Sequence, residues 1–340
     1  MGQIHLHRVG PGVTIQDLGR PGYLAQGLSR GGAADLLALA EGAALLGQDG
    51  ALAALEIAGS FLSVDVREST RIALTGAPMR ASCDGAALAW QASHALPKGA
   101  RLEMSASAGG YSYLHLGGGI ATERVLEARS AHLAAGLGQM LEAGASLPLG
   151  ADSGTRAGLT FTPQARFDGG ALRLVETPQT GLFPPDLRAR FTSTRFQKDT
   201  RGNRMGQRLI HQSAGFGLDA GLNILSEIIV PGDIQITGDG TPFVLLSECQ
   251  TTGGYPRIGT VLPCDMPRLV QAPAGAELWF KFISLEEAVA LETAEAARRA
   301  GLRGGLRPLI RDPHDIADLL AYQLVSGVTR GDELERDASC

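Results

Sequence analysis

The fold is decided by residues 53–76, which read AALEIAGSFLSVDVRESTRIALTG. This stretch contains three mainly apolar segments, at 53–58, 61–66 and 70–75, with small or polar residues between them. Segments of this length at intervals of about ten residues are typical of antiparallel β-structure rather than of βαβ units. The stretch therefore predicts an antiparallel barrel or sandwich.

The same pattern continues along the chain in both directions. We expect further strands at 4–9, 86–91, 100–106, 111–116, 171–176, 227–230, 234–237, 242–248, 258–262 and 276–283. A helix is expected at 33–46, where an apolar face ends at Gly47, and another at 285–299, with Ser284 as its N-cap. The polar, glycine-rich residues 147–170 are interpreted as a connector, and a short helix is expected at 313–325.

A weak internal repeat indicates two similar halves. Residues 55–59 resemble 226–232, residues 72–74 correspond to 244–246, and residues 97–102 correspond to 273–278, at a nearly constant offset. A fixed offset is the mark of a duplicated architecture. We therefore expect a mainly β protein with two tandem β-barrel-like domains, 1–165 and 166–300, a few peripheral helices, and a helical tail at 301–340.

Composition narrows the functional classes. The chain has 340 residues, of which 44% are hydrophobic, so it can bury two cores. A net charge of -5 gives no reason to expect nucleic-acid or membrane partners. The sequence has no P-loop motif and no C-x-x-C pair, and it shows no signal peptide or membrane-spanning run. We expect a reduced, cytoplasmic protein without a structural zinc site.

Two short motifs have simple alternative interpretations. Residues 27–31 fit G-x-S-x-G, but a serine hydrolase would place this motif in a parallel sheet, so we interpret it as a glycine-rich loop before a helix. His5 and His7 lie on one side of a strand without a nearby third ligand, and we interpret them as surface residues rather than as a metal site. No metal-binding residues are predicted.

The segment 250–257, Gln-Thr-Thr-Gly-Gly-Tyr-Pro-Arg, carries more information. Its two glycines allow close approach of the backbone to a ligand, and its amide, hydroxyl and guanidinium groups favour anions. The same residues are also compatible with an ordinary β-hairpin that carries polar side chains and binds no ligand. Arg204 and Arg208 lie four residues apart beside a glycine, and Asp17, Arg20 and Asp35 are compatible with a structural set of ion pairs.

Together these segments resemble the biotin-dependent carboxyltransferase-like family, also called allophanate hydrolase subunit 2, which includes the C subunit of 5-oxoprolinase. The resemblance covers residues 3–290. It is carried by Thr14 to Tyr23, by Gly31, Ala33 and Asp35, by Arg204 to Gly206 with Arg208 and Leu209, by Leu225 to Glu227, by Pro231 and Gly232, by Ile234 and Gln235, by Gln250 to Pro256 and by Asp265. It implies two barrels related to the cyclophilin-like fold, in agreement with the repeat. The sequence departs from the family pattern at 127–131, at 138–142 and at 174–178, and Glu127 stands where the family has glycine.

The resemblance implies one component of a heteromeric 5-oxoprolinase that hydrolyses 5-oxoproline to glutamate with ATP. Its partners would be a B-like subunit and an A subunit, with ATP bound together with a partner and a lactam or amide as substrate. The alternatives are the carboxyltransferase half of a urea carboxylase system, which would use biotin carried by another protein, and a regulatory binding subunit without catalysis. Gene neighbours would separate the first two.

On this hypothesis several arginines surround an oxyanion in the transition state. The candidate catalytic residues are Asp265, Arg204, Arg257 and Asp17, and the candidate substrate-binding residues are Arg20, Asp35, Arg129, Arg208, Gln250, Thr251, Gly253, Gly254 and Tyr255. We further expect Asp265 to be partly buried, to line one cleft with the loop 253–255, and to pair with Arg204 or Arg20.

Overall fold

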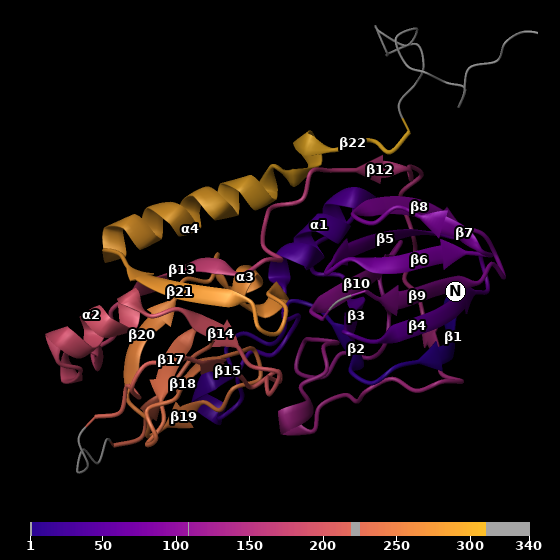
Figure 1. Cartoon of the computed structure of the whole chain (residues 1–340). Coiled ribbons are helices and arrows are strands. Elements are labelled where there is room, and N and C mark those ends of the chain that lie inside the picture. Colours follow the sequence, from indigo (N-terminus) through magenta and orange to yellow (C-terminus); the bar gives the residue numbers. More distant parts are fainter. Residues whose placement is uncertain (1, 108, 219–224, 311–340) are drawn as a thin grey trace, which may run out of the picture.

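The computed structural model describes residues 2–107, 109–218 and 225–310 (Figure 1). The first unit contains β1 (Gln3–Val9), β2 (Val13–Gln16), α1 (Leu36–Leu46), β3 (Ala54–Ala58), β4 (Phe61–Val66), β5 (Thr70–Gly76), β6 (Met79–Cys83), β7 (Ala86–Leu88), β8 (Ala92–Leu96), β9 (Leu102–Ala106), β10 (Tyr111–Leu116), β11 (Ser146–Pro148) and β12 (Leu159–Thr160). Its strands form a six-stranded sheet, ordered β11-β1-β4-β9-β6-β7, and a second sheet that begins β2-β3-β10-β5-β8-β12.

The core of the first unit lies between its two sheets. Ile4 and Leu6 of β1 and Ile57 of β3 are fully buried in the same apolar cluster as Ile72 and Leu114. Helix α1 packs on the other face of the second sheet, against β5 and β10. Asp35 is its N-cap and accepts hydrogen bonds from the backbone N–H groups of Leu37 and Ala38, and Gly47 ends it in the left-handed conformation.

The second unit is a closed seven-stranded barrel, ordered β13-β20-β17-β18-β15-β14-β21. Its elements are β13 (Gly170–Val175), α2 (Pro185–Ser193), β14 (Phe196–Lys198), β15 (Gly206–Ile210), β16 (Glu227–Ile228), β17 (Asp233–Ile236), β18 (Pro242–Leu245), β19 (Thr252–Gly253), β20 (Arg257–Val261), α3 (Met266–Gln271) and β21 (Glu277–Phe282). Phenylalanines fill its interior, with Phe191 stacked on Phe280 at 5.1 Å between ring centroids. Strands β16 and β19 form a separate two-stranded ribbon.

The end of the described chain returns to the first unit. Helix α4 (Leu285–Ala300) begins at Ser284, whose side chain accepts a hydrogen bond from the Glu287 N–H, and it runs from the barrel back toward α1 (Figure 1). Strand β22 (Arg307–Pro308) then pairs with β12 and completes the second sheet of the first unit.

The mainly β architecture with a few peripheral helices is confirmed, as are all the strands expected within the described residues, although several are shorter than expected. The sequence did not predict β2, β6, β8, β11, β12, β14, β15, β22, α2 or α3. Only the second unit closes into a single barrel, because the strands of the first divide between two sheets. The domain boundary near residue 165 stays a prediction, and the expected helix at 313–325 lies outside the described residues.

Candidate functional site

Arg204 crosses from the second unit into the first. Its guanidinium forms ion pairs with Glu56 of β3 and with Glu248, and it also donates to the carbonyl oxygen of Gly32. Both carboxylates are almost fully buried, at 1% and 2% side-chain exposure. Burial alone would lower the pKa of Arg204, but the two carboxylates raise it above its ordinary value. Arg204 is therefore a permanently charged connection between the two units.

Glu56 extends this connection into the first unit. Its second carboxylate oxygen accepts hydrogen bonds from the Tyr113 hydroxyl at 2.7 Å and from the backbone N–H of Ala34 at 2.8 Å. Burial, reinforced by the Glu56 charge, raises the pKa of Tyr113 well above its ordinary value, so this hydroxyl remains a donor. Arg204 also lines an apolar cavity of about 290 Å³ between the units, with Tyr111 and Met266.

Glu248 is connected to the loop of the G-x-S-x-G motif through His132. Its carboxylate accepts from the Ala134 N–H and lies 3.9 Å from Nδ1 of His132, whose Nε2 is 2.9 Å from the Ser29 hydroxyl. The Ala135 N–H points at Nδ1, so the neutral His132 carries its proton on Nε2 and donates it to Ser29. A general base would need the opposite tautomer. The geometry agrees with the interpretation of this motif as a structural loop.

A second cavity, of about 340 Å³, lies on the outer face of the barrel and is here called the signature cavity. It brings together two segments singled out from the sequence, around Asn203 and around Gln250. Its lining consists of Arg201, Asn203, Met205, Gly206, Ile229, Gln235, Thr237, Phe243, Leu245, Cys249, Gln250 and Tyr255. Burial raises the pKa of Cys249 to about 12, so its thiol stays protonated. The cavity offers amide, phenol and apolar contacts and is suited to positioning a small molecule.

The ribbon beside this cavity is held in place by Arg257. Glu227 of β16 pairs with Arg257 at 2.6 Å, and the buried Asp233 lies 3.3 Å from the same guanidinium. Residue 227 is also the register partner of Gly253 in β19, and the Thr251 carbonyl accepts from the Ile229 N–H. Gly254 follows β19 in the exposed turn. Arg257 thus pairs with carboxylates of the same chain. Through Glu227 it holds the ribbon that contains part of the loop 250–255.

Asp17, Arg20 and Arg129 meet within the first unit. Asp17 accepts hydrogen bonds from the backbone N–H of Gly19 and from that of Arg129. The Arg20 side chain is buried and donates to the carbonyl oxygens of Val125 and Ser130. Burial lowers the pKa of Arg20, opposed by the charge of Asp17. These contacts shape the loop 125–130 and leave Arg20 little capacity to bind an external anion.

The departure from the family pattern at Glu127 has a conformational consequence. Glu127 has φ of 67° and Leu126 has φ of 51°. Residues other than glycine adopt this left-handed region at a cost of roughly 1 kcal/mol or more. A glycine would suit this backbone, and the glutamate here adopts it under strain.

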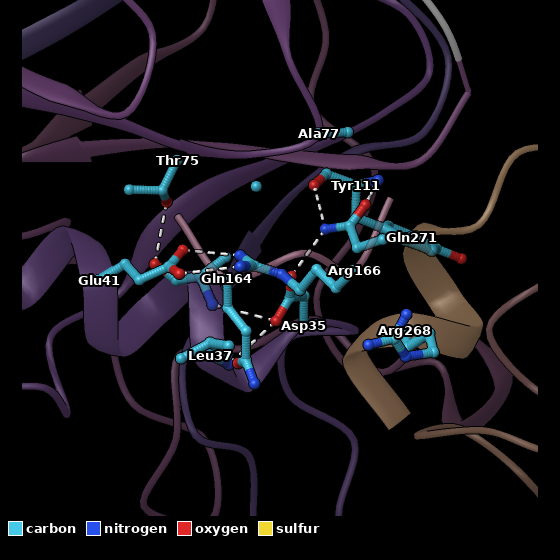
Figure 2. A network of polar contacts seen from close by, with 12 residues as sticks. Asp35, Leu37, Glu41, Thr75, Ala77, Tyr111, Gln164, Arg166, Arg268 and Gln271 are labelled. Atoms are coloured by element: carbon cyan, nitrogen blue, oxygen red, sulfur yellow. Dashed lines mark hydrogen bonds and ion pairs between the residues drawn. The ribbon is translucent and has the colours of Figure 1, made fainter. Parts of the chain in front are cut away.

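Asp35 belongs to a buried network that joins α1, the connector and α3 (Figure 2). Arg166 donates to Asp35 at 3.0 Å and forms a bidentate pair with Glu41, and Gln271 of α3 donates to the same Asp35 oxygen. Burial raises the pKa of Glu41 to about 7. The ion pair with Arg166 offsets this rise only in part, because the same guanidinium also serves the buried Asp35. Asp35 is therefore enclosed, and its position indicates a structural role.

The prediction that Asp265 pairs with Arg204 or Arg20 is wrong. Asp265 is partly buried, as expected, but it pairs with Arg173 of β13 at 2.5 Å and also accepts from the Arg173 backbone N–H. It lines a different cavity, with Arg268 and Arg298, whereas Tyr255 lines the signature cavity. The strand β20 lies between the two, since Arg257 is its first residue and Asp265 follows its last residue. The loop 253–255 does not fold back to Asp265.

The remaining predicted residues have internal partners. Arg208 pairs with Asp199 at 2.6 Å, His7 pairs with Asp65, and His5 bonds to Ser146. Within the described ranges, no three His, Cys, Asp or Glu side chains are grouped so that they could hold a metal ion. None of the helices in this part of the chain has the length and apolar character needed to cross a membrane.

Comparison with known proteins identifies the family. Residues 26–282 match the model of the carboxyltransferase domain, subdomain A and B. The chain belongs to this family. It is 34% identical to the C subunit of 5-oxoprolinase from Escherichia coli (strain K12), over 83% of this chain and 92% of that protein. The family resemblance inferred from the sequence is thereby confirmed.

Two solved structures share the fold. TTHA0988 superposes with a TM-score of 0.76 at 26% identity, over 83% of this chain and 55% of that one. The chain thus spans about half the length of TTHA0988. The Kluyveromyces lactis urea carboxylase superposes with a TM-score of 0.76 at 22% identity, over 92% of this chain and 31% of that protein.

Sequence reasoning missed the carboxylates that hold Arg204 and the amide of Gln235. Glu56 had a detectable signal, because it is a charged residue in the middle of an otherwise apolar strand segment. Gln235 lies between two isoleucines of a short strand, and Glu248 follows an apolar strand. Nothing in the sequence shows that a loop covers either side chain.

Proposed function

We propose that the chain is one component of a heteromeric, ATP-dependent 5-oxoprolinase, and that its signature cavity holds the lactam substrate. The similarity to the C subunit of 5-oxoprolinase over nearly the whole of both chains carries this proposal. The signature cavity supports it, because segments that are far apart in sequence converge on a space of small-molecule size.

The chemistry of the cavity favours a site shared with a partner. Opening a lactam needs an activated carbonyl, which ATP supplies by phosphoryl transfer, and it needs groups that stabilise the phosphoryl charge. The candidate arginines Arg20, Arg204 and Arg257 are committed to internal carbonyls and carboxylates. We therefore propose that a B-like subunit, with an A subunit, supplies the groups that bind and activate ATP.

A coupled assay tests this function. The purified chain is combined with its cognate A and B subunits, ATP and 5-oxoproline, and glutamate formation is measured. We expect ATP-dependent glutamate that disappears when this chain is omitted. Glutamate formation at the same rate without the chain contradicts the proposal. Tight assembly without turnover would favour the regulatory alternative instead.

Carboxyl transfer is the second candidate, favoured by the family match and by the shared fold with a urea carboxylase. Under this alternative the signature cavity would hold urea or a similar amide, and a carboxylated biotin would arrive on another protein. The matched test replaces the A and B subunits by a biotin carboxylase and a biotinylated carrier, and measures bicarbonate- and urea-dependent ATP hydrolysis.

A further inference from the structure

The side chain of Gln235 carries a buried donor without a partner. Gln235 lies on β17, is 7% exposed, and lines the signature cavity. Its Nε2 makes no hydrogen bond with any described residue. Leaving a buried amide donor unsatisfied destabilises the folded state, so a fold that retains one without a structural use for it requires an explanation.

The position of the amide indicates that the partner enters through the cavity. Ile234 and Ile236, on either side of Gln235, point into the barrel core, so Gln235 points outward. On that side Gly253 covers Nε2 so closely that a Cβ atom on Gly253 would lie 2.5 Å from it. Because Nε2 is not held by a hydrogen bond, rotation about the terminal side-chain bond can turn it toward a ligand at small cost.

The residues around Gln235 favour a neutral hydrogen-bond acceptor over an anion as the partner of its Nε2 donor. Cavity residues Asn203, Gln250 and Tyr255 are uncharged, and the cationic Arg201 is 72% exposed at the rim and paired with Asp199. A phosphate or carboxylate at the buried end would lose its hydration without gaining a charged partner. A neutral carbonyl oxygen loses much less hydration free energy on burial, and it can accept a hydrogen bond from the amide N–H of Gln235.

We propose that the signature cavity binds a small cyclic or acyclic amide through its carbonyl oxygen, and that Gln235 Nε2 is the donor that recognises it. A carboxylate at the other end of the ligand faces Arg201 at the rim. This inference rests on the proposed function in placing the substrate here, and it adds the recognising residue and the ligand class. Gln235 is a positioning residue with no proton to transfer.

Ligand binding tests the inference directly. The full-length chain, alone and assembled with its cognate A and B subunits, is titrated with 5-oxoproline, 2-pyrrolidinone and urea, and binding is followed by ligand-observed NMR and calorimetry. Proline, which lacks the ring carbonyl, is the negative probe. We expect Gln235→Leu to weaken binding of the carbonyl probes at least tenfold while its unfolding midpoint stays the same or rises, because an unsatisfied donor is removed.

Gln207→Leu is the matched control. Gln207 is a buried glutamine on β15, which β18 separates from β17 in the barrel, and its Nε2 donates to the carbonyl oxygens of Asp199 and Arg208. This variant should lose stability and keep the affinity of the wild type. If Gln235→Leu does not fold, Gln235→Met replaces it, because methionine has a similar length and flexibility and carries no hydrogen-bond donor.

The outcomes separate this inference from the proposed function. Wild-type affinity in both Gln235 variants overturns the inference, as does failure of every carbonyl probe to bind the wild-type chain in either form. Amide binding that depends on Gln235, without ATP-dependent glutamate formation, leaves the inference standing and removes the proposed function. Glutamate formation by the Gln235→Leu complex with an unchanged KM removes only the inference.

Discussion

Arg204, just before β15 of the barrel, forms an ion pair with Glu56, in the middle of β3 of the first unit. The same guanidinium pairs with Glu248 at 2.5 Å, so one positive charge compensates two carboxylates at the boundary between the units. Removing one member of a buried ion pair is costly because its partner is left charged and unsolvated. The integrity of the interface therefore depends on this residue.

Arg204→Met should destabilise the chain by about 3–5 kcal/mol in urea unfolding, because it leaves two buried carboxylates without a counter-charge. Arg201→Met is the control, since Arg201 is 72% exposed and its pair with Asp199 should contribute at most about 1 kcal/mol. Equal losses in the two variants would show that Arg204 does not connect the units.

Asp265→Asn should destabilise the chain without affecting catalysis. Asp265 accepts two side-chain hydrogen bonds and a backbone hydrogen bond from Arg173, so loss of its charge should cost roughly 1–3 kcal/mol. The remaining folded fraction should keep the specific activity of the wild type in the coupled assay. A large loss of activity at an unchanged melting temperature would instead restore Asp265 as a catalytic residue.

Glu41 should make the free energy of unfolding depend on pH in the range between its unfolded-state and folded-state pKa values. Its pKa is about 7 in the folded chain against an ordinary 4.5, so the folded state keeps a proton that the unfolded state releases between these values. Stability should therefore fall as pH rises through this window, by at most about 1.4 kcal/mol per pH unit, and level off above about pH 7.

Glu41→Gln isolates this contribution, because other groups titrate in the same range and some, such as His132, act in the opposite direction. The difference in unfolding free energy between the wild type and Glu41→Gln, measured by urea titration across the window, should change with pH in the stated sense. A difference that is constant with pH would show that Glu41 stays ionised throughout.

Gly253→Ala should impair the signature cavity. The added methyl group would lie 2.5 Å from Gln235 Nε2 and 3.0 Å from Ile229, so the ribbon or the amide must move. We expect at least a tenfold rise in the KM for 5-oxoproline in the coupled assay and a stability loss of about 1 kcal/mol. Gly238→Ala, which meets no atom within 4 Å, should leave both quantities unchanged.

The sequence predicted elements whose signals are local. Both long helices were found from local signals, an apolar face that ends at Gly47 for α1 and the N-cap Ser284 for α4, although α1 begins after Asp35 and not at residue 33. Strand β8, with the sequence ASHAL, was missed because alanine, serine and histidine lack the β-branched side chains on which strand recognition depends.

The site was predicted only in part, for a different reason. Gln250 and Tyr255, two of the candidate residues, line the signature cavity, but the cleft expected between the loop 253–255 and Asp265 does not form. The partners of the arginines could not be predicted, since Arg204 meets Glu56 from far away in the sequence and Arg173 rather than Arg204 reaches Asp265. Charge alone does not specify which of many carboxylates an arginine will meet in the fold.

The pairing of β22 with β12 has a consequence for how the chain is made. These strands flank the entire barrel in the sequence, yet they lie side by side in one sheet of the first unit. Topologically, the barrel is an insertion between two neighbouring strands of its companion. During synthesis from the N-terminus, the second sheet of the first unit can gain its last strand only after the barrel and α4 have left the ribosome. Contacts between distant segments form late because closing a long loop costs entropy. The first unit can therefore be complete only in a chain whose second unit has already been synthesised.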